Sequence, residues 1–149
     1  MQEMYKHEAK IKQHKNVTHY TYGRYGSTTT IELENILKEL EKAYHVFLTG
    51  TGFGGIALAL MSLCRPGDEI IVSDNVYGPT KEISEKLLKE FNINAKFYDP
   101  NSFDDLKNKV TKKTKMILVE NPGSNTFEFQ DLSKIVSLAK RKKTVSYTH

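Results

Sequence analysis

A glycine-rich turn in the first half of the chain constrains the fold more than any other feature. Residues 45–48 are a mostly apolar run, residues 50–55 contain four glycines, and an apolar segment follows to Leu58. We interpret this order as a strand, a tight turn and a helix. Glycine lets the backbone turn sharply and approach a ligand, and the first turn of a helix presents N–H groups with a partial positive charge. Such a turn is suited to binding a phosphate.

The composition fits one soluble domain of the cytoplasm. The chain has 149 residues, of which 38% are hydrophobic and 27% charged, and its net charge is +4. Its apolar runs are far shorter than the roughly 20 residues of a membrane span, and the single Cys64 cannot form an internal disulfide. The basic runs at residues 112–115 and 140–143 lack interleaved aromatic residues. We therefore expect no membrane association and no nucleic-acid partner.

Helical spacing of apolar residues predicts several helices. One is expected over residues 30–43, opened by a capping box between Thr29 and Glu32. Ser102, with Asp105 at the reciprocal capping position, is expected to open a short helix through Val110. The other expected helices follow the glycine turn, run over residues 83–91 and begin at Asp131.

Short apolar runs between these helices predict strands. They are residues 45–48, 69–73, 95–98 and 116–119, with a last strand beginning at residues 144–146. Strands that alternate with helices form a parallel sheet covered on both faces. The predicted fold class is therefore α/β, with three layers and a mostly parallel sheet. Ligands in such folds bind at loops that leave the carboxyl ends of strands, here residues 50–55, 74–80 and 120–124.

The glycine turn also fits a dinucleotide-binding site. Gly50, Gly52 and Gly55 match the G-x-G-x-x-G pattern, and Asp74 ends the next strand at the distance expected of a residue that binds a ribose hydroxyl. A helix and a polar loop precede this strand, whereas a dinucleotide-binding strand usually opens its domain. On these residues alone, a dinucleotide-binding fragment stays open as an interpretation.

Four motifs, in order along the chain, indicate a different phosphate site. They are Tyr22-Gly23-Arg24-Tyr25-Gly26 with Thr28-Thr29, Thr51-Gly52-Phe53, Tyr77-Gly78-Pro79-Thr80 and Glu120-Asn121-Pro122-Gly123-Ser124. Together they resemble the cysteine and methionine metabolism family of pyridoxal-phosphate enzymes, over residues 20–140. Four ordered motifs are more specific than one glycine turn, so we favour this family over the dinucleotide-binding fragment.

The resemblance implies a phosphate site shared between chains. Tyr22 and Arg24 match a pair that reaches across a subunit interface to the cofactor phosphate of a neighbouring chain, so we expect a homo-oligomer, which in the family is a tetramer. Thr51, Gly52 and Phe53 match the turn whose N–H groups bind the phosphate, with the Thr51 hydroxyl as a further donor.

The resemblance also assigns roles to two other residues. Tyr77 matches a tyrosine that stacks on the pyridine ring of the cofactor and assists proton transfer, which makes it the catalytic candidate. Ser124 falls where the family places a residue near the phenolic oxygen of the cofactor, and the Gly-Ser pair there is similar to the β-lyase branch. We expect no metal site, because the histidines lack metal-ligand spacing, and we expect Cys64 in the core.

The activity implied by the resemblance is β-elimination on a sulfur amino acid such as cystathionine, a carbon-sulfur lyase reaction of methionine biosynthesis that gives homocysteine, pyruvate and ammonia. Other activities of the family, those of a γ-lyase or a γ-synthase, remain alternatives. A third alternative is a non-catalytic subunit that donates Tyr22 and Arg24 to the site of a partner.

Part of the catalytic set implied by the family is missing from the sequence. In the family, the Schiff-base lysine and the aspartate beside the pyridine nitrogen follow the last motif, whereas this sequence continues with the exposed-looking run Lys140-Arg141-Lys142-Lys143 and six further residues. We therefore expect a truncated chain that is inactive alone. Its expected parts are an N-terminal arm with the Tyr-x-Arg loop, residues 1–29, and a partial cofactor-binding large domain, residues 30–149.

Overall fold

The computed structural model describes residues 22–149. The chain divides into two compact units, Met1–Thr49 and Gly50–His149, each of which is described by itself. Of the arm and Tyr-x-Arg loop expected over residues 1–29, residues 1–21 lie outside the described residues. Within the part that is described, every helix is too short or too polar to cross a lipid bilayer.

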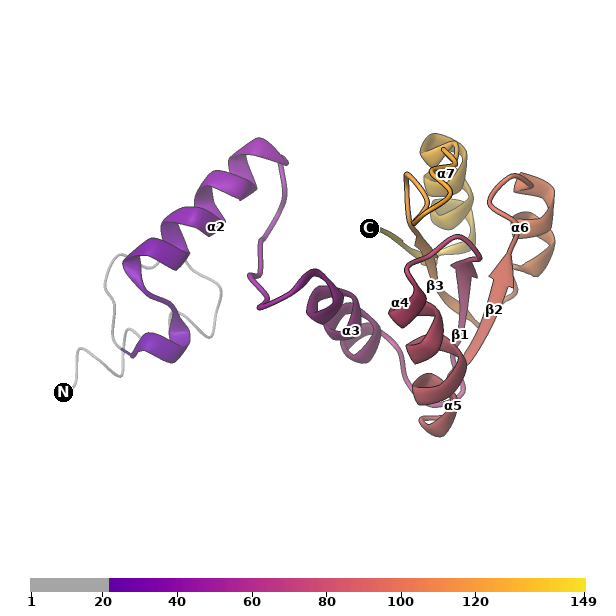
Figure 1. Cartoon of the computed structure of the whole chain (residues 1–149), viewed down its shortest axis with the longest axis horizontal. Helices are drawn as coiled ribbons and strands as arrows, with labels where there is room; N and C mark the ends of the chain where they lie inside the picture. The colour runs from indigo at the N-terminus through magenta and orange to yellow at the C-terminus, as the bar shows by residue number, and fades with distance from the viewer. Residues whose placement is uncertain (1–21) are drawn as a thin grey trace. The chain divides into compact units, whose positions relative to one another are not determined.

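The described part of the first unit, from residue 22 on, contains a short 3-10 turn, η1 (Gly23–Tyr25), and the helix α2 (Thr28–Leu40) (Figure 1). This confirms the helix that we expected over residues 30–43, but the predicted cap is wrong. Ser27 is the N-cap, since its Oγ accepts from the N–H of Thr30 at 3.3 Å and its own N–H donates to Thr30 Oγ1 at 2.8 Å. The helix begins earlier than expected, so Thr29 and Glu32 already lie inside it.

The strand predicted over residues 45–48 is absent from the described structure. Residues 45–49 have no regular secondary structure, and none of the four strands pairs with them. An extended segment becomes a strand only when a neighbour satisfies its N–H and C=O groups. Phe47 is accordingly 67% exposed, although its ring contacts His45 edge to face at 4.4 Å between ring centroids.

The second unit alternates helices with strands, as predicted. Its elements are α3 (Gly52–Leu63), β1 (Glu69–Ser73), α4 (Gly78–Glu82), η2 (Ile83–Leu87), α5 (Leu88–Glu90), β2 (Asn94–Tyr98), α6 (Phe103–Lys109), β3 (Thr114–Val119), α7 (Leu132–Lys142) and β4 (Val145–Thr148). The π-helical turn η2 joins α4 and α5 without a break, so the helix expected over residues 83–91 begins at Gly78 instead. Pro79 suits that first turn, where its missing N–H has no helical partner.

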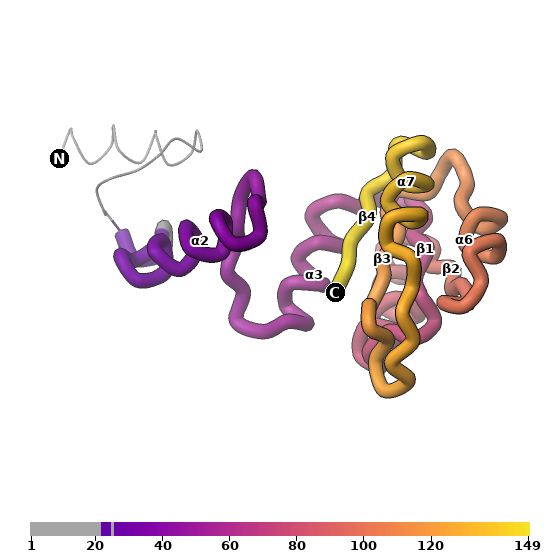
Figure 2. Tube along the Cα trace, turned by 90° about the horizontal axis from the view of Figure 1, so that it is seen from above, coloured from indigo at the N-terminus to yellow at the C-terminus, as the bar shows by residue number. Residues whose placement is uncertain are grey.

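The four strands form one parallel sheet in the order β2-β1-β3-β4 (Figure 2). Glu69 pairs with Thr114 and Ile70 pairs with Met116, so Lys115 is an extra residue in β3 and forms a bulge at the start of the strand pair. Because all strands run the same way, their carboxyl ends meet at one edge of the sheet. The loops expected to bind a ligand are brought to that edge.

Helices cover both faces of the sheet, which confirms the three-layer α/β class. Successive side chains of a strand point to opposite faces. Ile70 and Val72 therefore pack in a core with α3, η2 and α5, whereas Ile71 packs in a second core with α6 and α7. Cys64 is buried in the first core as expected, with 4% of its surface exposed.

The short helix α6 has the predicted cap but not the predicted reciprocal bond. Ser102 Oγ accepts from the N–H of Asp105 at 3.2 Å. The carboxylate of Asp105 accepts instead from the N–H of Asp99 at 2.9 Å and from Lys109 at 2.7 Å. The N–H of Ser102 donates to the carbonyl oxygen of Asp99, so the turn before the helix satisfies the group that Asp105 was expected to bind.

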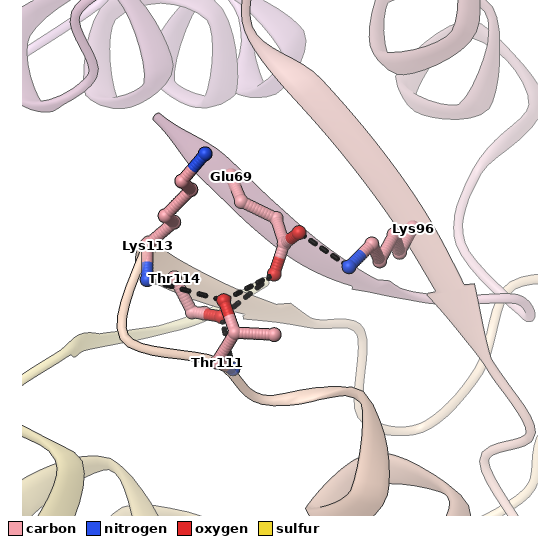
Figure 3. Close-up of polar contacts among 5 residues, drawn as sticks. All are labelled: Glu69, Lys96, Thr111, Lys113 and Thr114. Atoms are coloured by element: carbon pink, nitrogen blue, oxygen red, sulfur yellow. Dashed lines mark hydrogen bonds and ion pairs between the residues drawn. The ribbon is translucent and has the colours of Figure 1, made fainter. Parts of the chain in front are cut away.

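A buried carboxylate joins three strands at the amino edge of the sheet (Figure 3). Glu69 begins β1 and is 6% exposed. One of its oxygens accepts hydrogen bonds from the hydroxyls of Thr111 and Thr114, each at 3.0 Å, and the other forms an ion pair with Lys96 of β2. Both oxygens of the buried carboxylate are thus satisfied, as its burial requires.

These contacts outweigh burial in setting the pKa of Glu69. Burial by itself raises the pKa of this carboxyl, but the bonds from Lys96, Thr114 and Thr111 and the charge of Lys96 bring the pKa below its usual value. A carboxyl with a lowered pKa in the folded state stabilises the fold above its unfolded-state pKa. That contribution is lost as the pH falls through the folded-state pKa.

We predict that Glu69→Gln lowers the free energy of unfolding by about 1–3 kcal/mol at neutral pH, because it removes an ion pair and weakens two buried hydrogen bonds. Urea denaturation measures this. The difference from the parent chain is expected to shrink when the pH is lowered below the ordinary carboxyl pKa, about 4.3. Glu82→Gln is the matched control, since Glu82 pairs with Lys86 on an exposed helix face. An equal loss of stability at both pH values would contradict the assigned role of the Glu69 charge.

Candidate functional site

Two predicted site residues lie in adjoining loops at the carboxyl edge of the sheet. Tyr77 follows β1 at the start of α4 and is 48% exposed. Ser124 lies in the loop after β3, and its N–H donates to the carbonyl oxygen of Asn75 at 2.9 Å. Glu120, at the end of β3, accepts from the N–H of Tyr77 at 2.8 Å. The two loops are therefore bonded to each other at Asn75 and at the N–H of Tyr77.

Gln130 connects the carboxyl ends of three strands, from which these loops begin. Its side-chain oxygen accepts from the hydroxyl of Tyr98 at 2.5 Å. Its side-chain nitrogen donates to Ser73 Oγ at 3.0 Å and to the carbonyl oxygen of Glu120 at 3.3 Å. Its backbone N–H donates to Asn121 Oδ1 at 2.7 Å. The side chain thus joins the carboxyl ends of β1, β2 and β3.

Asn75 and Gly123 are packed against each other beside Ser124. Asn75 is buried and accepts from the hydroxyl of Ser73, while its side-chain nitrogen donates to Glu128 at 3.2 Å. A Cβ on Gly123 would lie 2.1 Å from that nitrogen. Only glycine lets the loop pass so close to Asn75, which fixes the backbone that carries Ser124.

The predicted phosphate turn forms the start of a complete helix. Thr51 is the N-cap of the 12-residue helix α3, and its side-chain oxygen accepts from the N–H of Gly54 at 2.9 Å. Gly52 and Phe53 open the first turn, where helical N–H groups have no partner within the helix. A Cβ on Gly52 would lie 3.4 Å from His149 Cε1, and the N–H of His149 donates to the carbonyl oxygen of Val119 at the end of β3. The turn therefore lies at the carboxyl edge of the sheet.

The other predicted pair, Tyr22 and Arg24, belongs to the first unit. The guanidinium carbon of Arg24 lies 5.6 Å from the centre of the Tyr22 ring, a cation–π contact on η1. The structure thus brings Tyr22 and Arg24 together within one unit, and Thr51, Gly52, Phe53, Tyr77 and Ser124 together at one sheet edge of the other.

Two tyrosines near this edge have raised pKa values. Burial raises the pKa of Tyr98 to about 12, against the opposing effect of its bonds with Ser73 and Gln130. Its hydroxyl therefore stays protonated and donates to Gln130. Burial also raises the pKa of Tyr147, with a smaller contribution from the negative charge of Glu120.

Asp74 has a different partner from the one that a dinucleotide site requires. Its carboxylate forms an ion pair with Lys81 at 2.6 Å, and the Lys81 ammonium also lies 5.2 Å from the centre of the Phe97 ring. The segment before the glycine turn has no strand among the described residues. Both features weaken the interpretation of the turn as a dinucleotide-binding fragment.

One cavity lies away from the predicted residues. It has a volume of about 220 Å³ and lies between α6 and α7, bordered by Ser102, Phe129 and Lys134. Among residues 22–149, no cluster of three metal-ligating side chains is present. The predicted residues at the carboxyl edge offer N–H and hydroxyl donors and the Tyr77 phenol.

Several residues of this edge were missed in the sequence. Ser73, Asn75, Glu128 and Gln130 are ordinary loop and strand-end residues in the sequence, and they gain their roles from bonds between segments up to 57 residues apart. Glu120 carried one signal, since a carboxylate directly follows an apolar strand that ends at this edge.

Comparison with known proteins identifies the family. The sequence model of the Cys/Met metabolism PLP-dependent enzymes matches residues 2–148. Over 128 residues, the chain is 35% identical to cystathionine beta-lyase of Bordetella avium, covering 86% of this chain and 32% of that protein. It is 31% identical over 120 residues to L-methionine gamma-lyase of Fusobacterium nucleatum subsp. polymorphum, covering 80% of this chain and 30% of that protein.

The fold agrees with a solved structure of the same family. Cystathionine gamma-lyase of Lactobacillus plantarum, complexed with L-serine, superposes with a TM-score of 0.83 at 28% identity, covering 88% of this chain and 34% of that one. The chain spans about a third of the length of the curated relatives that it matches. The likeness in sequence and fold extends over most of its own length, and the chain belongs to the Cys/Met metabolism family of pyridoxal-phosphate-dependent enzymes.

Proposed function

We propose that this chain is part of a cystathionine β-lyase-like carbon-sulfur lyase. The observation that carries the proposal is the arrangement at the carboxyl edge, where a capped helix start, a tyrosine and a serine meet in a chain of this family. Relatives named cystathionine beta-lyase support the β-elimination activity. The methionine gamma-lyase relative supports a γ-lyase as the second candidate. Either reaction takes a sulfur amino acid as its substrate.

The donors at this edge fit pyridoxal phosphate. The Thr51 hydroxyl and the N–H groups of Gly52 and Phe53, at the positive end of α3, are suited to a phosphate dianion. When bound, this cofactor serves as an electron sink for the substrate. We assign Tyr77 to stack on the cofactor ring and to move a proton through its hydroxyl, and Ser124 to donate near the phenolic oxygen. The loop bonds at the N–H groups of Tyr77 and Ser124 fix the backbone that carries both side chains before any ligand arrives.

We further propose that Tyr22 and Arg24 bind the phosphate of a neighbouring copy. A phenol and a guanidinium offer several donors, and both residues lie on the same short turn. In this arrangement the active species is a homo-oligomer. The alternative is a non-catalytic chain, which donates Tyr22 and Arg24 to the site of a partner and has no active site of its own.

We also propose a cytoplasmic location. Cys64, a buried free thiol, is compatible with a reducing compartment.

Titration with cofactor tests the proposed function. The chain is expected to bind pyridoxal phosphate, followed by its absorbance, in preference to pyridoxal and to reduced nicotinamide cofactor. Thr51→Ala is expected to lower the affinity about 5–10-fold, because it removes a donor to the phosphate and the cap of α3. Thr51→Ser keeps both and is expected to bind as the parent does.

Ser102→Ala is the matched control for the loss of a helix cap. Ser102 caps α6 through the same kind of bond that Thr51 makes on α3, but it is not among the proposed phosphate donors. The affinity of the Ser102→Ala variant for pyridoxal phosphate is expected to equal that of the parent chain. Preferred binding of the nicotinamide cofactor, or equal binding of pyridoxal and pyridoxal phosphate, would contradict the proposed site.

The exposure and charge of the lysines bear on whether borohydride can trap pyridoxal phosphate on one of them. None of the lysines within residues 22–149 is buried. Lys81, which follows Tyr77 in the same segment, is held by Asp74, and the bond to Asp74 raises the pKa of its ammonium. A protonated amine is a poor nucleophile. Borohydride reduction of the 149-residue chain with pyridoxal phosphate is therefore expected to leave no stoichiometric adduct on one lysine, as measured by mass spectrometry and peptide mapping. A single fully modified lysine would contradict this.

Self-association is expected through α2. Leu33, Ile36 and Leu40 form an apolar stripe on this helix, and they are 44%, 56% and 72% exposed. We predict that the 17.0 kDa chain sediments as an oligomer and that Ile36→Lys shifts it towards the monomer. Asn35→Lys, on the opposite side of the same helix, is the control and is expected to leave the association intact. A monomeric parent chain in analytical ultracentrifugation would contradict the proposed oligomer.

A further inference from the structure

We propose that Glu120 is a positioning residue for Tyr77. It fixes the place of the phenol by holding the backbone from which the tyrosine side chain extends. The consequence for the cofactor rests on the function proposed above, in which Tyr77 stacks on the cofactor ring. The positioning itself is a property of the chain and is testable without any ligand.

The contact joins the ends of neighbouring strands. Glu120 directly follows β3, and its Oε2 accepts from the N–H of Tyr77 at 2.8 Å, across 43 residues of sequence. The carbonyl oxygen of Tyr77 accepts from the N–H groups of Thr80 and Lys81, at 2.8 Å and 3.1 Å. The N–H of Tyr77 is thus held by β3 and its carbonyl by α4. With both ends of the residue fixed, only rotation about the side-chain bonds remains for the ring.

Glu120 is itself held on the sheet side. Its carbonyl oxygen accepts from Gln130 Nε2 at 3.3 Å, and the next residue, Asn121, accepts from the backbone N–H of Gln130 at 2.7 Å. Gln130 is in turn bonded to Tyr98 and Ser73. The Glu120 carboxylate therefore extends from a backbone that is bonded to three strand ends. Through its bond to the N–H of Tyr77, it restricts the backbone of this half-exposed residue.

Besides the bond from the N–H of Ser124 to the carbonyl oxygen of Asn75, the ion pair of Asp74 with Lys81 is a further candidate for holding this loop. It lies on the surface, with the Lys81 and Asp74 side chains 40% and 52% exposed. Exposed pairs contribute little because water screens them. It also joins two residues of the same loop and helix, so it leaves the loop without a link to β3. The bond from Glu120 supplies that link, and Asp74 provides a matched control.

A single indole at position 77 reports on this contact. The chain has no tryptophan, so Tyr77→Trp introduces a single tryptophan at position 77, which is excited at a longer wavelength than the remaining tyrosines. In the Tyr77→Trp variant, Glu120→Ala removes the acceptor. Glu120→Asp shortens the side chain, so that its carboxylate no longer reaches the N–H of residue 77. Each is expected to shift the balance between the held and released loop about tenfold towards release. Acrylamide quenching and fluorescence anisotropy measure this as higher accessibility and faster rotation of the indole.

Two variants separate positioning from a general loss of structure. Glu120→Gln keeps an acceptor oxygen at the same place and is expected to behave as the reporter parent does. Asp74→Ala removes the neighbouring ion pair and is expected to leave the quenching unchanged. The proposal is overturned if Glu120→Asp leaves the indole as protected as in the parent, or if Asp74→Ala exposes it to the same degree. Glu120→Asp carries the test if Glu120→Ala fails to fold.

A second experiment tests whether the bond between Glu120 and the N–H of Tyr77 affects cofactor binding. In the chain with Tyr77 intact, Glu120→Asp is expected to weaken pyridoxal phosphate binding, while Glu120→Gln binds as the parent does. If the parent chain binds no pyridoxal phosphate, the proposed function fails for the isolated chain, whereas the indole experiment still decides whether Glu120 positions residue 77. The two failures are therefore distinguishable.

Discussion

The carboxyl edge of the sheet depends on one amide side chain, that of Gln130. Parallel strands end at this edge with polar groups that the hydrophobic layers above and below cannot satisfy. Gln130 accepts from the Tyr98 hydroxyl and donates to Ser73 and to the backbone of Glu120, so one residue satisfies the ends of β2, β1 and β3. A partly buried amide that uses its donors and its acceptor in this way has one stable orientation. The loops that leave these strands therefore start from fixed points.

The amino edge is organised by a charge instead of an amide. Glu69 accepts from Thr111, Thr114 and Lys96, and this network lies among short turns at the far end of the strands. Its contacts join the starts of the strands to the turn before β3. At the carboxyl edge, by contrast, the bonds end in half-exposed residues such as Tyr77. Stabilising contacts thus gather at the amino edge, whereas the residues proposed to bind the cofactor lie at the carboxyl edge.

The contents of the carboxyl edge were predictable to different degrees. Thr51, Tyr77 and Ser124 were found because their motifs occur in a fixed order in the sequence. Asn75 and Gln130 were not found, because an amide in a loop carries no sequence pattern, and its partners are set by how the strands align. The close contact of Gly123 with Asn75 belongs to the same class, since the need for glycine arises only when the two loops meet.

By itself the sequence determined the order of helices and strands, the parallel α/β class, the burial of Cys64 and the family, because apolar spacing and ordered motifs are local properties. Tertiary structure decided what depends on partners. It left residues 45–48 without a strand, because pairing needs a neighbour, and it moved the cap of α2 from Thr29 to Ser27. It also brought Glu120 to the N–H of Tyr77. Hydrogen bonds between distant segments form only after the chain has folded, and no local pattern of residues encodes them.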